Sequence, residues 1–100
     1  MQIELDQLTN RTAEAEAFLK QLSNRNRLMI LCVLMDQELS VSELNERVPL
    51  SQSALSQHLS KLRESKLVST RRDAQTIYYQ LCDERVNKVL TSLYEIFCQD

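Results

Sequence analysis

The stretch that decides the fold of this chain is LSQSALSQHLSKL, residues 50–62. In a helix, where successive residues are about 100° apart, Leu55, Leu59 and Leu62 fall on one side. Most of the other side chains fall on the opposite side, and they are short hydroxyls, an amide and a cation. The pattern predicts an amphipathic helix that docks on a core through its leucines and turns a polar face outward.

The polar face of this helix is suited to DNA. It carries no carboxylate before Glu64, whereas an ordinary solvated face usually mixes Glu with Lys to gain i,i+4 pairs. Hydroxyl, amide and ammonium groups can approach phosphates and hydrogen-bond to base edges. We therefore interpret the stretch as a DNA recognition helix whose outward groups are Ser53, Ser56, Gln57, Ser60 and Lys61.

The residues before this helix complete a helix-turn-helix. Ser51 can cap the first turn, and Pro49 discourages the preceding helix from running through. A short helix is expected upstream, beginning at Ser40 or Ser42 and ending near Val48. Two short helices joined by a tight turn, the second polar on its outer face, form a helix-turn-helix.

The charge is unevenly distributed along the chain. The net charge is −2, but residues 47–75 hold six basic and two acidic side chains, a net of +4. Residues 1–46 hold four basic and eight acidic side chains, and residues 76–100 hold two and four. The positive charge is confined to the segment with the proposed recognition helix, which is the distribution that a DNA-binding surface needs.

Length and composition indicate one mainly helical domain over residues 1–100. The chain has 43% hydrophobic residues, no Gly, one Pro and five aromatic residues. A domain of 100 residues folds alone around a modest core, so oligomerisation would help it. Because no stretch is long and apolar enough to cross a membrane and the N-terminus does not resemble a signal peptide, we expect a cytoplasmic protein without a membrane partner.

Two helices are predicted before the helix-turn-helix. The first, residues 3–22, has a narrow apolar stripe that includes Phe18 and Leu19. The second is expected to be capped by Ser23 and to contain residues 28–35, which are apolar on every side. A helix that is apolar all round is a buried one, so this helix should form the centre of the core.

After Ser65 the pattern changes to that of strands. Residues 67–71 and 76–81 are rich in β-forming residues, with Ile77, Tyr79 and Leu81 alternating as one buried face. Residues 72–75 form the predicted polar turn. A two-stranded hairpin after a helix-turn-helix makes a winged helix, in which Arg71 and Arg72 are expected at phosphates or the minor groove.

A last helix is predicted from Asp83 to the C-terminus. Val86, Leu90, Leu93 and Phe97 are spaced four, three and four residues apart, close to a heptad seam. We expect the first and last helices to form a homodimer surface. A two-fold dimer would place two recognition helices on palindromic double-stranded DNA, about one helical turn apart.

This order of elements resembles the ArsR/SmtB family of small dimeric winged-helix regulators. The likeness covers about residues 15–98 and is carried by LSQSALSQHLSKLRESKL, residues 50–67, and by QTIYY, residues 75–79. It implies DNA contact from matching positions on the recognition helix and the wing. With the polar face described above, the predicted DNA-binding set is Ser51, Gln52, Ser53, Ser56, Gln57, His58, Lys61, Arg71, Arg72 and Gln75.

The metal sites of that family are not matched here. Where arsenic-type members have Glu-Leu-Cys-Val-Cys, residues 38–42 read Glu-Leu-Ser-Val-Ser. The zinc type uses Asp and His pairs on the last helix, but His58 is the one histidine of this chain. Transition metals need several thiolates or imidazoles. We therefore predict no metal site and no cofactor.

The family resemblance gives two cysteines a role. Cys32 and Cys98 match the positions that form the switch in the redox- and sulfide-responsive subgroup of the family. The resemblance implies that the dithiol form binds DNA and that oxidants or persulfides bridge the two sulfurs and release it. Taken alone, a cysteine in an apolar run is more often a small hydrophobic residue. Cys82 has no counterpart in the pattern and is taken as incidental.

Other functions stay open at this point. A metal-responsive repressor with a non-standard site and an anti-silencing activator would both have the same DNA-binding sequence features. A thiol enzyme is disfavoured, because the chain has no Cys-x-x-Cys motif and no Gly-rich loop. The prediction is a non-enzymatic, dimeric transcriptional regulator switched by Cys32 and Cys98.

Overall fold

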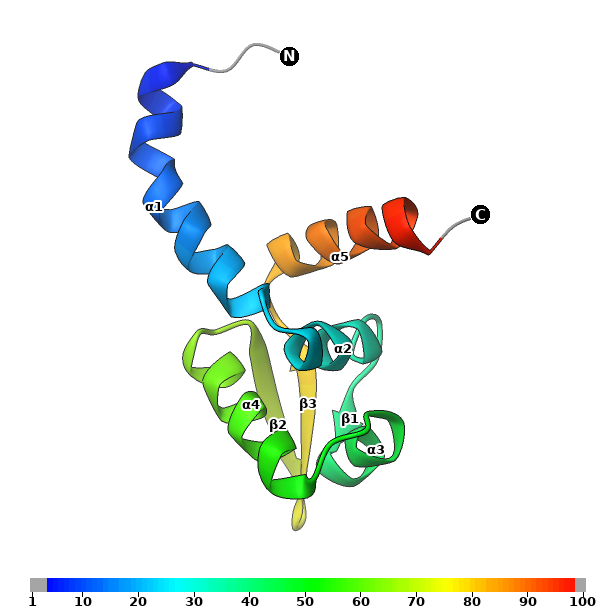
Figure 1. Cartoon of the computed structure of the whole chain (residues 1–100). Helices are drawn as coiled ribbons and strands as arrows, with labels where there is room; N and C mark the ends of the chain where they lie inside the picture. The colour runs from blue at the N-terminus through cyan, green and yellow to red at the C-terminus, as the bar shows by residue number, and fades with distance from the viewer. Residues whose placement is uncertain (1–3, 99–100) are drawn as a thin grey trace.

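A computed structural model describes residues 4–98 of the chain (Figure 1). In these residues the elements follow the order α1 (Leu5–Leu22), α2 (Arg25–Val33), β1 (Leu39–Ser40), α3 (Val41–Arg47), α4 (Gln52–Glu64), β2 (Val68–Asp73), β3 (Thr76–Leu81) and α5 (Glu84–Phe97). The architecture is a winged helix-turn-helix with helices before and after it, as predicted. The predicted start of the first helix at residue 3 lies outside the described residues.

The helix-turn-helix consists of α3 and α4, and both start at the expected caps. Ser40, rather than Ser42, begins α3 with a capping box in which its Oγ accepts from the Glu43 N–H while the Glu43 carboxylate accepts from the Ser40 N–H. Ser51 Oγ accepts from the Ala54 N–H at 3.2 Å and begins α4. Short-range hydrogen bonds therefore fix where each of the two helices begins.

The wing is part of a three-stranded antiparallel sheet with the order β1-β3-β2. The hairpin is longer than predicted, because Arg72 and Asp73 pair with Ile77 and Thr76 instead of lying in the turn. The turn tightens to two residues, with Ala74 at a positive φ of 57°. β1 was not predicted. It has only two residues and exists because Leu39 and Ser40 pair with β3.

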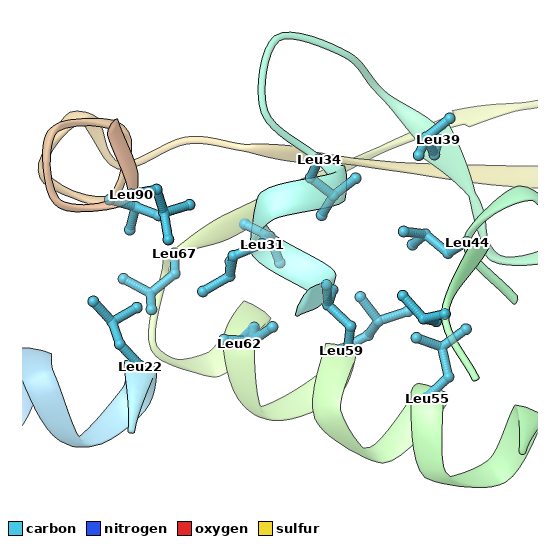
Figure 2. Packing of buried hydrophobic residues seen from close by; sticks show 14 residues of the cluster. Leu22, Leu31, Leu34, Leu39, Leu44, Leu55, Leu59, Leu62, Leu67 and Leu90 are labelled. Atoms are coloured by element: carbon cyan, nitrogen blue, oxygen red, sulfur yellow. The ribbon is translucent and has the colours of Figure 1, made fainter. Parts of the chain in front are cut away.

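The core lies between α2, α4 and the sheet. Figure 2 shows leucines of α2, α4 and α5 pointing toward one another, and the leucine stripe of α4 is fully buried, as expected. In the wing, Tyr79 and Leu81 pack against this core while half-buried. Ile77 is also only half-buried, so the predicted buried face of β3 is confirmed in part.

The prediction for α2 was wrong in two respects. Its cap is Asn24 rather than Ser23, because Asn24 Oδ1 accepts from the N–H groups of Asn26 and Arg27. The helix is also not buried all round: Ile30 is buried, but Cys32 is exposed. The reason is that α5 covers only part of α2 and leaves an apolar groove between the two helices.

α1 and α5 project from the body at the end opposite the wing tip and the start of α4 (Figure 1). The radius of gyration, 15.2 Å, exceeds the roughly 13 Å expected of a compact domain of this size. α5 begins where predicted, with Asp83 as its N-cap. Large apolar side chains stay exposed on both projecting helices, namely Leu5, Leu19, Tyr94, Ile96 and Phe97. No helix in residues 4–98 combines the length and hydropathy needed to cross a membrane.

Candidate DNA interface and cysteine groove

The outer face of α4 is open to solvent along its length. Gln52, Ser53, Ser56, Gln57 and Lys61 are all exposed, while the leucines beneath them are buried. The first charged residue of the helix is Lys61, so its N-terminal half presents only uncharged polar groups. Ser51 lies at the same end of α4, where its Oγ already caps the helix and is 3.4 Å from Ser53 Oγ. This face can donate and accept hydrogen bonds without repelling phosphates.

The two wing arginines have different surroundings. The Arg71 guanidinium donates to both carboxylate oxygens of Glu38, with Nε 3.1 Å from Oε1, and stacks on the Tyr78 ring at 4.7 Å. The hydrogen bonds from Arg71 lower the pKa of Glu38. Arg72, next along the strand, points to the other face and is exposed, as is Gln75 in the turn. Arg71 therefore links the wing to Glu38, the residue before β1, whereas Arg72 and Gln75 extend from the wing tip.

His58 of α4 is half-buried on the side of the helix that contacts α2. Its Nδ1 accepts a hydrogen bond from Arg27 Nε at 3.4 Å, and Arg27 Nη1 also donates to Gln21 Oε1 at 3.3 Å. Burial, then the charges of Arg27 and Lys61, lower the pKa of His58. The imidazole is thus neutral at pH 7, with Nδ1 as its acceptor atom. Sequence reasoning missed Arg27 and Gln21, because they are distant from His58 in sequence and belong to no motif.

Cys32 and Cys98 lie on the same groove, between α2 and α5. The groove has a volume of about 540 Å³, and both cysteines are exposed. Burial against its apolar walls raises the pKa of the Cys32 thiol, and the nearby Cys98 raises it further. Cys82 does not line this groove; its Sγ donates to the Lys66 carbonyl at 3.3 Å. The other lining residues are Leu28, Met35, Leu90, Thr91, Leu93, Tyr94 and Phe97.

Potential metal ligands are dispersed. Within residues 4–98, no three His, Cys, Asp or Glu side chains come close enough together to hold a metal ion. At the position of the arsenic-type motif, Glu38 pairs with Arg71, and Ser40 caps α3. These side chains thus serve the fold of the helix-turn-helix and the wing.

A helix-turn-helix with an exposed polar second helix, followed by a hairpin with basic residues, defines a winged-helix DNA-binding protein. The chain belongs to the arsR family of bacterial regulators. Residues 24–70 match the family model described as "Bacterial regulatory protein, arsR family". It is therefore a DNA-binding transcriptional regulator and not an enzyme.

Three similar proteins cover most of the chain. The transcriptional activator HlyU of Vibrio cholerae is 47% identical over 95% of this chain and 88% of its own length. The solved structure of reduced HlyU matches this chain with a TM-score of 0.88 at 47% identity, and the match covers 95% of this chain and 100% of that one. Nodulation protein NolR of Rhizobium meliloti is 54% identical over 86% of this chain and 70% of its own. The transcriptional repressor BigR of Xylella fastidiosa has a crystal structure with a TM-score of 0.91 at 38% identity, covering 98% of this chain and 100% of that one.

Proposed function

We propose that this arsR-family regulator binds a palindromic operator as a homodimer and that bridging Cys32 to Cys98 releases it from DNA. The observation that carries the proposal is the shared groove: two exposed thiols, 66 residues apart in sequence, line one cavity between α2 and α5. One solved structure of the relative HlyU is of its reduced form.

The chemistry starts at Cys98 in this proposal. Its thiol is exposed at the end of α5, whereas the raised pKa of Cys32 leaves less of the reactive thiolate at that position. With a peroxide, the Cys98 thiolate takes up one oxygen as sulfenic acid and releases an alcohol or water. The Cys32 thiol then displaces water from it to form the disulfide.

A persulfide RSSH leads to the same bridge. The Cys98 thiolate attacks the outer sulfur, so that the thiol RSH leaves and Cys98 carries a persulfide. Attack by Cys32 on the Cys98 sulfur expels hydrosulfide and forms the disulfide. If a second persulfide RSSH first converts Cys32 to a persulfide in the same way, with loss of RSH, the outer sulfur of Cys32 attacks the Cys98 sulfur and again expels hydrosulfide. The product is a trisulfide bridge, which spans a wider gap than the disulfide limit of about 7 Å between Cα atoms.

Either bridge would tie α2 to the end of α5. We propose that α5 and α1 form the dimer surface, because they carry Leu5, Leu19, Tyr94, Ile96 and Phe97 exposed. Pulling α5 toward α2 would alter this surface and so the spacing of the two recognition helices. A dimer reads two half-sites about 34 Å apart, so a change in this spacing weakens binding.

The proposed DNA contacts come from α4 and the wing. On α4 the exposed polar groups would contact bases and phosphates, and Arg72 and Gln75 would contact the backbone or minor groove. Arg71 would serve mainly by holding the wing, because Glu38 and Tyr78 already engage its guanidinium.

The direction of regulation depends on the promoter. Among the relatives, HlyU is named an activator and BigR a repressor, although both align over nearly the whole chain. The same DNA-bound dimer would repress by covering a promoter or activate by displacing a silencer. A reporter assay with and without the regulator, together with a footprint of the operator, distinguishes the two.

The test is a mobility shift with DNA from upstream of the protein's own gene, using reduced, peroxide-treated and persulfide-treated protein, followed by intact mass. We expect binding by the reduced dimer, loss after either treatment, and a Cys32–Cys98 cross-link. Cys32→Ser and Cys98→Ser should each bind DNA and resist release, and the control Cys82→Ser should behave like the wild type.

Release of Cys32→Ser from DNA by persulfide would contradict the proposed pairing of Cys32 with Cys98. Stoichiometric zinc or copper in the purified protein would instead favour a metal-responsive regulator.

A further inference from the structure

Arg27 links three helices through side-chain hydrogen bonds. From α2, its Nε donates to His58 Nδ1 on α4 at 3.4 Å, and its Nη1 donates to Gln21 Oε1 on α1 at 3.3 Å. All three side chains are half-buried. Such partly shielded hydrogen bonds are less weakened by competition with water than exposed ones.

α2 carries this contact and the cysteine groove on different sides. Arg27 and Leu31 are four residues apart and lie on the side toward α4, where Leu31 is fully buried. Cys32 is five residues after Arg27, about 140° around the helix, and lines the groove with α5 together with Leu28 and Met35. Because α2 has only nine residues, a movement imposed on one side is transmitted to the other.

We infer that Arg27 is a positioning residue that couples the cysteine pair and helix α1 to the recognition helix, and that His58 acts in this coupling rather than at DNA. The hydrogen bond orients α4 relative to α2 while the thiols are reduced. When α2 is tied to α5, Arg27 moves with it and the orientation of α4 is lost. The coupling half of this inference rests on the proposed thiol switch; the effect of Arg27 on the reduced protein does not.

The protonation state of His58 supports the contact. Nδ1 accepts from Arg27 only in the neutral imidazole, whose proton is then on Nε2. The nearby groups that would oppose a second charge are Arg27 and Lys61, and burial acts in the same direction, so the pKa of His58 is lowered. The lowered pKa therefore favours the neutral imidazole that accepts from Arg27.

The test measures operator affinity of the reduced full-length protein for Arg27→Gln and for the matched control Arg25→Gln. Arg25 is exposed on the same helix, so its replacement removes the same charge. We expect Arg27→Gln to bind about 2- to 30-fold more weakly than the control, the range by which residues in a coupling network act. The salt dependence should be unchanged, because loss of a phosphate contact would lower the slope by about one. Equal affinities for the two variants, or a reduced slope for Arg27→Gln alone, would overturn the inference.

Variants of His58 separate positioning from simple packing. In His58→Asn the amide oxygen can lie close to the Nδ1 position and accept from Arg27, whereas His58→Leu fills the space without an acceptor. We expect His58→Asn to retain operator affinity and His58→Leu to lose as much affinity as Arg27→Gln does. The double variant Arg27→Gln/His58→Leu should lose no more than either single change. Additive losses would mean that the two residues act independently and would overturn the coupling.

NMR of the imidazole gives a readout that does not depend on the thiols. The chain has one histidine, so its ring signals are unambiguous. We expect an Nε2-protonated tautomer in the wild type and a changed Nδ1 signal in Arg27→Gln but not in Arg25→Gln. If wild-type binding is insensitive to peroxide and persulfide, the proposed switch fails, but these signals and the reduced-state affinities still decide the role of Arg27. An Nδ1 signal unchanged in Arg27→Gln would overturn it.

Discussion

At the start of α5, the Asp83 carboxylate forms two kinds of contact. Its Oδ1 accepts from the Arg85 backbone N–H at 2.9 Å, which caps the helix, and both oxygens accept from the Arg85 guanidinium. The same guanidinium stacks on Phe18 of α1 at 4.6 Å and lies 3.5 Å from Glu14. Asp83 thus connects the cap of one projecting helix to the other through a single arginine.

Replacing Asp83 by Ala should lower the free energy of unfolding by about 1 kcal/mol at pH 7, the usual cost of losing an N-cap. The Arg85 hydrogen bonds lower the pKa of Asp83 in the folded protein. The charge-dependent part of this stabilisation is therefore fully present above the unfolded pKa, near 3.9, and is lost as the pH falls through the lower folded pKa. Urea denaturation at pH 7 and pH 3 measures both effects.

The control for this experiment is Asp83→Asn, which keeps an oxygen at the cap but has no charge. We expect the free energy of unfolding of this variant to stay close to the wild-type value at pH 3. At pH 7 it should fall mainly by the part that the interaction with Arg85 contributes. A deficit for Asp83→Ala that is the same size at both pH values would show that the carboxylate charge contributes nothing.

Local capping was predictable from sequence, and longer-range contacts were not. The cap at Ser51 and the start of the last helix at Asp83 were predicted correctly, because a helix start depends on residues two or three positions away. The choice of Ser23 over Asn24 was wrong, since both residue types cap helices and only the backbone decides between them. The contact of Arg27 with His58 spans 31 residues, and no pattern in either segment indicates it.

Among the elements, those with a complete pattern of their own were predicted best. The leucines of α4 specify its buried face whatever it packs against, and all three are buried. β1 has two residues and depends on pairing with β3, so its own sequence carries no strand signal. The open side of α2 could not be foreseen, because its exposure depends on how far α5 extends over it.

The recognition helix allows a direct test. Gln57 is exposed on the uncharged part of α4, and a bidentate contact from a glutamine to a base is worth about 1–3 kcal/mol. Gln57→Ala should weaken operator binding by this amount and leave binding to unrelated DNA nearly unchanged. Fluorescence anisotropy at fixed salt measures both affinities.

A matched control for this helix is Gln7→Ala, which removes an exposed glutamine from α1. It should bind the operator like the wild type. If Gln57→Ala binds like the control while retaining its helical circular dichroism, the recognition surface has been placed on the wrong side of α4.

The proposed DNA-binding surface and the two projecting helices lie at opposite ends of the molecule. The helix-turn-helix and wing occupy one end and the projecting α1 and α5 the other, and the extents are 49 × 34 × 21 Å (Figure 1). Residues 47–75, with a net charge of +4, include α4 and β2 at the first end, whereas residues 1–46, with a net charge of −4, run from α1 into α3 and so extend over both ends. The sequence predicted that the first and last helices form a dimer surface, but not that α5 would also wall the cysteine groove. In the proposed dimer, α5 would therefore take part in both surfaces.

Exposed leucines on α1 allow a test of the proposed dimer. Leu5 and Leu19 are fourteen residues apart, which places them on nearly the same face of α1, and they are 73% and 54% exposed. Burial of one leucine stabilises by roughly 1.5–3 kcal/mol, and a two-fold dimer loses two of them, so Leu19→Glu should raise the dimer dissociation constant by about 100-fold or more. Analytical ultracentrifugation measures this change.

The control Ala13→Glu adds the same carboxylate to an exposed position about 120° away on the helix. A monomer contacts one half-site, so operator affinity should fall with dimerisation in Leu19→Glu and stay near the wild-type value in Ala13→Glu. If both variants sediment as wild-type dimers, α1 lies outside the interface and the pairing must come from α5 alone.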